Sequence, residues 1–373
     1  MFSLTICVLS QNINQSLTEP LYIMAYQIDY IPVGDGEKNG DAIALRFGNL
    51  AGPRAEQTVV VIDGGFKESG EALVEHIKNY YGTTHVDLVV STHPDGDHTS
   101  GLSVVLEQLT VDVLVMHRPW EHAADIKNMF KSGRITASGL EESLEKSLQH
   151  ASDLEALATK KGVKIVEAFQ GTGGYNGAVL VLGPSKDFYE SLLPHFRSTP
   201  APATNLGFLA PIKKATEEAV KWIKDHVLVD LLNDDEDTTS PENNTSTIIL
   251  FSIDGHKLLF TGDAGKTALN NAADYAEKAN IPLHDLGFLD VPHHGSKRNL
   301  NSKILKRIKA QTAFISASKD SPKHPAKKLT NALQKHGTKV FVTRGVSLLH
   351  HYNGPDRRWG MAQAEPFHDL VEE

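Results

Sequence analysis

The chain has little cysteine, few aromatic residues and no long hydrophobic run. Its 373 residues include a single cysteine, Cys7, which excludes an internal disulfide framework and zinc sites built from several cysteines. No stretch approaches the roughly 18 uninterrupted apolar residues of a membrane-spanning helix, so a membrane segment is excluded as well. Because a cysteine-poor chain fits a reducing compartment, we expect a cytoplasmic protein. Any metal must then be held by the 18 histidines and by the carboxylates.

The opening segment, residues 1–24, has an apolar start but neither a basic region nor a small-residue cleavage site, so it does not resemble a signal peptide. We expect a poorly ordered N-terminal extension, with either Met1 or Met24 as the true start. From Met24 onwards, short β-branched runs alternate with amphipathic helical stretches, as in a mixed α/β domain. A helix is expected at residues 71–80, and strands are expected at residues 26–31, 42–47, 58–62, 86–91, 111–116, 246–253 and 257–260.

The middle of the chain, residues 121–242, is more polar and more helical than its flanks. It holds an expected strand pair at residues 163–168 and 179–182, a helix at 213–232 and a closing acidic loop that contains proline. Residues 25–373 are therefore expected to form one domain that carries a helical insertion at about residues 121–242. The insertion could act as a lid, a protein-partner site or a dimer contact.

The segment STHPDGDHTS is the most informative in the sequence. It places His93, Asp95, Asp97 and His98 within six positions, directly after an apolar strand. Alternate residues of an extended loop project to opposite sides, so such a run can supply two adjacent cations with different ligands. A polar turn would explain the aspartates, the glycine and the proline, but not a histidine at each end.

Two further segments place metal-capable residues after apolar strands. Asp263 follows the strand at residues 257–260, and His293 and His294 follow an apolar run at residues 286–291. Each could be ordinary alone, since aspartate caps helices and histidine pairs are often solvated. Together with the first cluster they predict one pocket with two cations about 4 Å apart, bridged by Asp263, a spacing that suits phosphoryl displacement by a shared water.

This ordered set of motifs resembles the metallo-β-lactamase hydrolase superfamily, and most closely the hydrolase domain of ComEC-type DNA-uptake competence proteins. The resemblance implies an αββα sandwich that holds two divalent cations, zinc or manganese. It runs from about residue 26 to residue 352 and leaves the insertion uncovered. The motifs that carry it are Gly40-Asp41-Ala42-Ile43, Ile62-Asp63-Gly64-Gly65, His93-Pro94-Asp95-Gly96-Asp97-His98 with Gly101, Thr261-Gly262-Asp263, Pro292-His293-His294-Gly295-Ser296 and His324-Pro325.

Metal ligands follow from the resemblance position by position. His93 and Asp95 would hold the first metal, and Asp97 and His98 the second. Asp263 would bridge the two metals. The second site would be completed by His294 or, as the weaker alternative, by His293.

Catalytic roles are implied for Asp97, Asp63 and His324. Asp63 matches a position that supports the metal loop or orients water in the family, although a turn aspartate is an equally good explanation. A protonated imidazole at His324 could bind the scissile phosphate or donate a proton to the leaving oxygen. A helix-capping or solvated histidine is the alternative.

Two departures from the wider family concern the first metal. Asp95 stands where most members have a second histidine, which shifts the preference from zinc toward manganese. Asn243 and Asn244 stand where a Gly-His turn is usual, so the first metal could be loosely held, and Asn244 is a candidate substrate contact. His117 could substitute as a ligand, although an ordinary strand-end position also explains it.

The net charge of −9 hides a strong segregation. Residues 297–339 contain twelve lysines and arginines and one acid, so this window carries +11 and the remainder of the chain −20. A polyanion approaching the metal site would meet this surface first. Candidate substrate contacts are Lys297, Arg298 and Lys323, with Arg344 as a weaker one. The alternative is that these charges cover solvated helix faces.

The sequence thus predicts a metal-dependent hydrolase that cleaves phosphodiester bonds by a metal-bound hydroxide, a nuclease acting on DNA or RNA. One alternative is a hydrolase of a small ester, thioester or lactam on the same metal site. Another is a binding or scaffold subunit that has lost a metal, which Asn243 and Asn244 would favour. The expected partner is nucleic acid or another phosphodiester, not a membrane.

Overall fold

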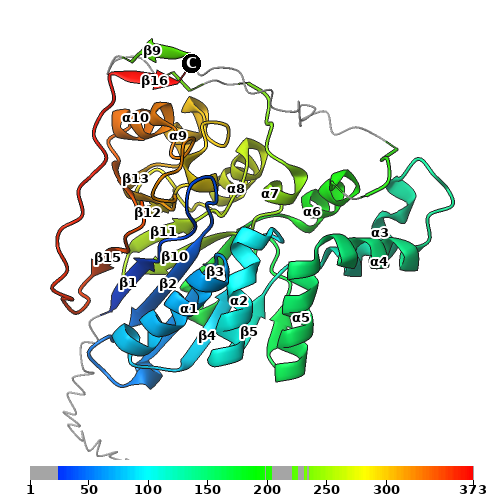
Figure 1. The fold of residues 1–373 in the computed structure, drawn as a ribbon, viewed down its shortest axis with the longest axis horizontal. Coiled ribbons are helices and arrows are strands. Elements are labelled where there is room, and N and C mark those ends of the chain that lie inside the picture. The colour runs from blue at the N-terminus through cyan, green and yellow to red at the C-terminus, as the bar shows by residue number, and fades with distance from the viewer. Residues whose placement is uncertain (1–23, 198, 204–220, 226–230, 233–234, 373) are drawn as a thin grey trace, which may run out of the picture.

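The computed structural model describes residues 24–197, 199–203, 221–225, 231–232 and 235–372 (Figure 1). The expected N-terminal extension lies outside the described residues, as does most of the helix expected at residues 213–232. Within that stretch, residues Trp222–Lys224 form a strand, β9, so the helix prediction is wrong there. Among the residues that the structure describes, no helix has the length and apolar character needed to cross a membrane.

The first of two large sheets has seven strands in the order β15-β1-β2-β3-β4-β5-β6. Strands β15, β1, β2 and β3 pair antiparallel, whereas β3, β4, β5 and β6 pair parallel. The parallel strands end at one edge of the sheet, and this edge carries the histidine and aspartate loops. The strands are β1 (Ala25–Tyr30), β2 (Ala42–Gly48), β3 (Gln57–Gly64), β4 (His85–Val90), β5 (Thr110–Val115), β6 (Lys164–Val166) and β15 (Leu348–Tyr352).

The second sheet also has seven strands, in the order β14-β13-β12-β11-β10-β8-β7. Strands β11 to β14 are parallel, while β10 pairs antiparallel with both β11 and β8. The strands are β7 (Gly173–Gly174), β8 (Val179–Gly183), β10 (Ile248–Ile253), β11 (His256–Phe260), β12 (Leu286–Asp290), β13 (Ala310–Ile315) and β14 (Lys339–Val342). A small ribbon of β9 and β16 (Leu370–Glu372) stands apart from both sheets.

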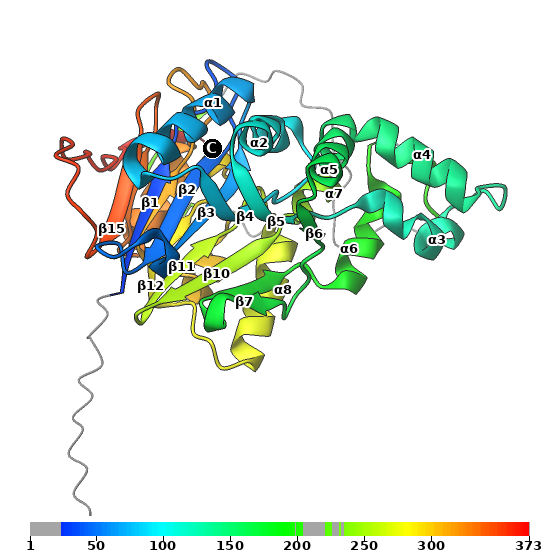
Figure 2. The same cartoon turned by 90° about the horizontal axis from the view of Figure 1, so that it is seen from below.

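The two sheets face each other and helices cover both outer faces (Figure 2). Successive residues of a strand point to opposite faces, so Val60 and Ile62 of β3 enter the core between the sheets, while Val59 and Val61 pack under the helices. The first sheet is covered by α1 (Lys67–His76), α2 (Gly96–Gln108) and α5 (Gln149–Lys161), and the second by α8 (Lys266–Lys278), α9 (Ser302–Arg307) and α10 (Lys327–Lys335). The expected α/β class and αββα sandwich are confirmed.

The expected insertion, residues 121–242, is not wholly separate from the sandwich. Strand β6 extends the first sheet and strand β8 extends the second. The helical lobe to the right in Figure 1 is built mainly by α3 (Ala123–Ile126), α4 (Ala137–Ser147) and α6 (Lys186–Leu192). Helix α5 joins this lobe to the sandwich because it packs along α2. The lobe therefore lies beside the helix that follows the histidine motif.

Gly101 allows α2 to lie against the end of β3. Its backbone N–H donates to the carbonyl of Gly65 at 2.9 Å. A Cβ atom on Gly101 would lie 1.9 Å from the carbonyl oxygen of Gly64, which is backbone and cannot swing aside. The close approach fixes the first turn of α2, where Asp97 and His98 lie, relative to β3, where Asp63 lies.

We expect Gly101→Ala to lower the free energy of unfolding by about 1–3 kcal/mol, the usual cost of overpacking a tight contact. The matched control is Gly133→Ala in the lobe, because nothing lies within 4 Å of the Cβ position there. Urea unfolding followed by circular dichroism measures both. Equal stability of the two variants would contradict the proposed contact.

Candidate metal centre

The predicted metal-binding residues gather where β3, β4, β11 and β12 end. Asp63 lies at the end of β3, and the loop after β4 carries His93 and leads into α2. Asp263 follows β11 and His294 follows β12 in the opposite sheet. The carboxyl ends of parallel strands are a common location for ligand sites. Here both sheets of the sandwich contribute to one site.

Asp263 lies in the middle of the cluster, and its two oxygens face different histidines. Oδ1 lies 3.5 Å from Nε2 of His98 and 3.8 Å from Nε2 of His294. Oδ2 lies 3.8 Å from Nε2 of His93 and 3.6 Å from Nε2 of His293. A carboxylate placed in this way can bridge two cations, one on each side.

The ring orientation of three histidines is fixed through Nδ1. Nδ1 of His98 donates to Oδ2 of Asp63 at 2.7 Å, and Nδ1 of His294 donates to the carbonyl oxygen of Ser316 at 3.0 Å. Nδ1 of His93 lies 3.0 Å from Oγ1 of Thr92. Each Nε2 is thereby directed toward Asp263. Metal-binding histidines are commonly held in this way by a partner on the other ring nitrogen.

Among the residues that the structure describes, the buried atoms that face Asp263 have no hydrogen-bond partner. They are Nε2 of His93, His98 and His294, together with Oδ1 of Asp263 itself. Ligand atoms of Asp97, His98 and His294 also lie within 4.8 Å of one another. Unpaired buried polar atoms are rare because they are costly. Imidazole nitrogens and carboxylate oxygens are ligands for divalent zinc and manganese, so the residues present fit such cations.

The pKa values of the clustered residues are shifted in different directions. Burial raises the pKa of Asp263 to about 7. Burial alone would lower the pKa of His294, but the carboxylates of Asp263 and Asp41 outweigh it and raise this pKa to about 9. Burial, together with the charge of His294, lowers the pKa of His293 to about 3. A divalent cation would satisfy the carboxylates and the ring nitrogens at the same time.

Asp41 belongs to the site, although the sequence analysis assigns it no role there. It precedes β2 and is buried, with Oδ1 3.5 Å from Nδ1 of His294 and Oδ2 3.8 Å from Nδ1 of His98. Asp41, His98 and Asp263 form one group of atoms that could hold a metal. The available signal was the motif around Gly40 and Asp41, which the family resemblance already contains.

Asp95 differs from the other expected ligands. Its Oδ1 accepts a hydrogen bond at 2.7 Å from Nη2 of Arg197, a residue that follows the lobe in the chain. Arg197 also donates to Oε1 of the buried Glu242 through its backbone N–H and through Nε. No group of metal-capable atoms among the described residues includes Asp95. Its ligand role stays a prediction, and the structure shows an ion pair at this position.

The asparagine turn contacts the site through Asn243. Its Nδ2 donates to Oδ2 of Asp263 at 2.8 Å. Asn244 is fully buried and its Nδ2 faces the carbonyl oxygens of Thr239 and Ser240, so its side chain is not placed to contact a substrate. Of the two asparagines, Asn243 is the one that contacts the carboxylate at the centre of the site.

His117 does not lie among the metal-capable residues. Its Nε2 donates to the carbonyl oxygen of Ala168 at 3.1 Å, and its ring stacks on Phe169. Burial lowers its pKa to about 4. The structure therefore supports the structural interpretation of His117.

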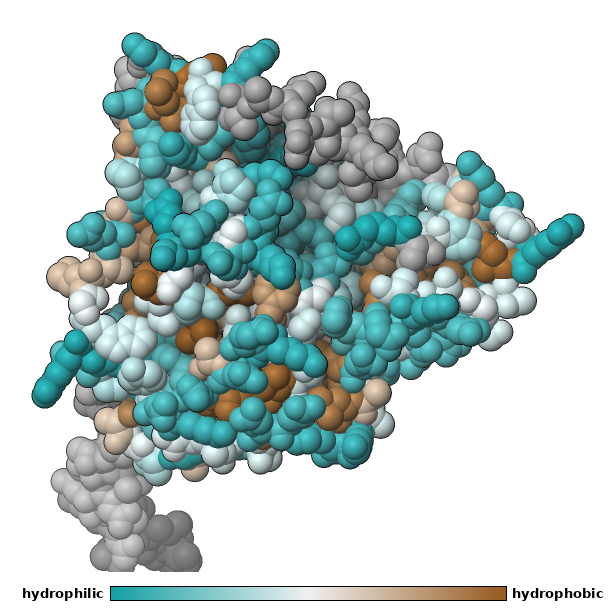
Figure 3. Space-filling view, viewed as in Figure 1, coloured by the Kyte–Doolittle hydropathy of each residue, from teal (hydrophilic) through white to brown (hydrophobic). Residues whose placement is uncertain are grey.

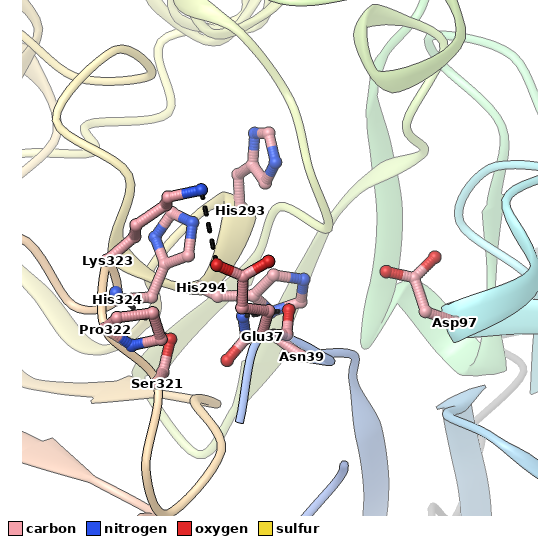
Figure 4. Close-up of a pocket in the computed structure, with 9 residues that line it drawn as sticks. All are labelled: Glu37, Asn39, Asp97, His293, His294, Ser321, Pro322, Lys323 and His324. Carbon is pink, nitrogen blue, oxygen red and sulfur yellow. Dashed lines mark hydrogen bonds and ion pairs between the residues drawn. The ribbon is translucent and has the colours of Figure 1, made fainter. Parts of the chain in front are cut away.

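The site opens into a polar cavity of about 260 Å³ (Figure 4). Asp97 lies on one side of the cavity and the histidines after β12 lie on the other. The His324 ring stacks on that of His293 with centroids 6.0 Å apart, and its Nδ1 has no hydrogen-bond partner in the described part of the chain. Lys323 forms an ion pair with Glu37 across the cavity mouth at 3.6 Å. The lining residues are Glu37, Asn39, Asp97, His293, His294, Ser321, Pro322, Lys323 and His324.

Only part of the basic window faces this cavity. Lys323 lines it, and the exposed Arg298 lies close enough that its charge contributes to the lowered pKa of His324. Burial is the larger cause and takes the pKa of His324 to about 4. Lys297 is half-buried and does not line the cavity.

Two further lysines of the window, on helix α10, are engaged by other parts of the chain, whereas Lys306, Lys309, Lys319 and Lys339 are exposed. The β9–β16 ribbon lies on α10, where Lys335 forms a buried ion pair with Asp225 at 2.5 Å. The ammonium of Lys327 lies 4.9 Å from the ring centre of Trp222. Arg344 donates to both carboxylate oxygens of Glu365, at 2.5 and 2.9 Å, and does not line the cavity.

Comparison with known proteins agrees with this geometry. The family model of the metallo-beta-lactamase superfamily matches residues 54–319 of this chain. The chain belongs to the metallo-beta-lactamase superfamily. The matched region includes His93, Asp263 and His294, whereas Asp41 and His324 lie outside it.

Individual relatives of the superfamily are distant. ComE operon protein 3 of Bacillus subtilis is 26% identical over 133 residues, which is 35% of this chain and 16% of that protein. This match agrees with the expected similarity to ComEC-type proteins, although the chain spans a small part of that relative. An archaeal superfamily protein of Sulfolobus tokodaii has 16% identity and a TM-score of 0.27, covering 63% of this chain and 62% of its own. A mutant of the CmlA beta-hydroxylase has 12% identity and a TM-score of 0.42, covering 88% and 54%.

We expect Asp63→Asn to weaken metal binding about 10- to 100-fold, the usual effect of losing the partner that orients a metal-binding histidine. The amide keeps the size of the side chain but removes the charge that faces Nδ1 of His98. Isothermal titration with Zn²⁺ and Mn²⁺ measures the change, with Asp320→Asn, an exposed acid, as the control. If Asp63→Asn bound metal like the control, the orienting role would be refuted.

Proposed function

We propose that this chain is a metal-dependent phosphodiesterase, acting as a nuclease at the centre around Asp263. The observation that carries the proposal is the arrangement of Asp263: its two oxygens each face ring nitrogens that have no hydrogen-bond partner among the described residues. Two divalent cations held by these residues would supply a nucleophile at neutral pH and would neutralise the charge that develops on phosphate oxygens.

The chain's own residues bind and orient the phosphate. His324 lies beside the metal-facing histidines and lines the cavity, and its buried Nδ1 has no partner among the described residues. Lys323 places an ammonium group at the cavity mouth, where its present partner, Glu37, is mostly exposed and can be displaced. Arg298 adds a positive charge nearby. A phosphodiester would thus meet hydrogen-bond donors on the side opposite Asp97.

The polar lining favours a charged substrate over a small apolar one. Pockets for small organic molecules are mostly lined by apolar and aromatic side chains. The cavity at the metal centre contains no large apolar side chain among its lining residues. This composition supports a phosphodiester over an apolar ester, thioester or lactam.

Asn243 favours a second candidate, a subunit with an incomplete metal site. Its amide N–H donates to Oδ2 of Asp263 and so uses an oxygen that the first metal would need. An amide nitrogen cannot take its place as a ligand. Metal analysis separates the two: two ions per chain after loading with Mn²⁺ or Zn²⁺ support the phosphodiesterase, and fewer than one supports the binding subunit.

We expect Asp263→Asn to lower phosphodiesterase activity by more than about 1000-fold, because it removes the charge between the two cation positions. Activity is measured with a chromogenic phosphodiester, with single- and double-stranded DNA and with RNA, each in Mn²⁺, Zn²⁺ and Mg²⁺. The control is Asp254→Asn in the exposed turn between β10 and β11, a left-handed position that asparagine tolerates. Hydrolysis retained in Asp263→Asn would refute the bridging role.

A further inference from the structure

A second and larger cavity adjoins the metal centre. It measures about 620 Å³ and shares Glu37, Asn39 and Asp97 with the cavity of Figure 4. Asp97 is also one of the residues grouped around the expected cations. Both cavities therefore border Asp97, one of the expected metal ligands, so a substrate can extend from the metal centre into the second cavity.

The chemistry of the second cavity differs from that of the first. Phe66, at the start of α1, presents a half-buried aromatic ring. Lys38 and Lys67 are exposed on its rim, and neither ammonium group has a carboxylate partner among the described residues. The remaining lining residues are Glu37, Asn39, Glu68, Gly96, Asp97, Ser100 and His150. An aromatic face flanked by free cations suits a planar base that is joined to phosphate.

The helical lobe supplies one wall of this cavity. His150, at the start of α5, lies over the glycine of the histidine motif: a Cβ atom on Gly96 would lie 2.6 Å from the His150 ring. The neighbouring cavity, about 310 Å³, continues along His150 to Arg197 and Asp95. Mostly hydrophilic residues cover the surface between the main body and the lobe (Figure 3). The three neighbouring cavities thus form one hollow that runs from Lys323 past the metal centre to the lobe.

We propose that the 620 Å³ cavity binds one nucleotide of a single-stranded polynucleotide, next to the phosphodiester that is cleaved; this rests on the proposed function. The base stacks on Phe66, and Lys38 and Lys67 bind the backbone phosphates on either side of it. A base can stack on a protein ring only when it is free of its own helix, so the substrate is single-stranded DNA or RNA. The volume lies within the roughly 300–1000 Å³ of sites for molecules of this size.

The test compares substrates that do and do not reach the cavity. Phe66→Leu keeps an apolar side chain but removes the ring, and Phe66→Tyr keeps the ring. We expect Phe66→Leu to weaken binding of a fluorescent single-stranded oligothymidylate with phosphorothioate linkages about 5- to 150-fold, the range for one stacked base. Phe66→Tyr is expected to bind like the unmodified chain. Fluorescence anisotropy measures binding, and kcat/KM for bis(p-nitrophenyl) phosphate is expected to stay unchanged in both.

The cation contacts are tested in the same assay. The double variant Lys38→Ala with Lys67→Ala should weaken oligothymidylate binding. The slope of log K against log salt concentration should also become shallower, by the amount expected for the loss of about two phosphate contacts. The control pair, Lys146→Ala with Lys160→Ala, removes two exposed lysines of the lobe side that do not line the cavity. We expect the control pair to bind like the unmodified chain.

The outcomes separate this inference from the proposed function. If the unmodified chain cleaves no phosphodiester in any metal, the proposed function fails. If it cleaves the chromogenic substrate but Phe66→Leu and the lysine pair bind oligothymidylate normally, the nucleotide subsite is refuted. If these variants lost oligothymidylate binding and kcat/KM for bis(p-nitrophenyl) phosphate to the same extent, the metal centre would be damaged. That result would also refute the nucleotide subsite. If unlabelled double-stranded DNA displaced the fluorescent oligothymidylate as well as unlabelled single-stranded DNA does, the single-strand requirement would be refuted.

Discussion

The site depends on one buried carboxylate, Asp263, that the protein leaves partly unsatisfied. An ionised carboxylate is costly to bury unless it is paired or binds a metal. The protein fixes the Asp263 backbone, because its N–H donates to Oγ of Ser246 and its carbonyl oxygen accepts from Nδ2 of Asn299. The residues that the structure describes offer Oδ1 no hydrogen-bond donor. A rigid acceptor without a donor is the arrangement that a cation completes.

The sandwich explains how distant segments reach this carboxylate. Asp63 and His93 come from one sheet, while Asp263 and His294 come from the other. The parallel strands of each sheet end at the same edge, so short loops suffice to bring the side chains together. The packing of Gly101 against Gly64 and Gly65 sets how closely α2 approaches β3. The position of His98 relative to Asp63 follows from that contact.

Much of the fold and of the metal cluster could be predicted from the sequence, because the informative residues stand directly after apolar strands. What could not be predicted depends on contacts between distant segments. The burial of Asp41 beside His98 and His294 requires β2 to lie next to β3. Arg197 reaches Asp95 only because the chain returns from the lobe at that point.

The basic window, residues 297–339, likewise shows what a sequence cannot predict about charge. A run of lysines and arginines does not reveal which face of a helix each side chain occupies. In the structure the β9–β16 ribbon brings acids and an aromatic ring onto α10, where they meet Lys327 and Lys335. For these two lysines, a count of charges overestimates what is open to a polyanion. Lys323 lines the metal-centre cavity because it lies in the loop after β13 rather than on α10.

The lobe is coupled to the metal-binding loop at two points, and this limits how the two can move. His150 lies on Gly96, and Arg197 pairs with Asp95, the residue just before it. Both contacts fall on the first turn of α2, between the expected ligands of the two cations. A displacement of the lobe must therefore either carry this turn along or break the ion pair. Since Arg197 is largely exposed, its pairing with Asp95 is weakened by solvent. Because Asp95 is one of the expected ligands of the first cation, breaking this ion pair would free its carboxylate for that role.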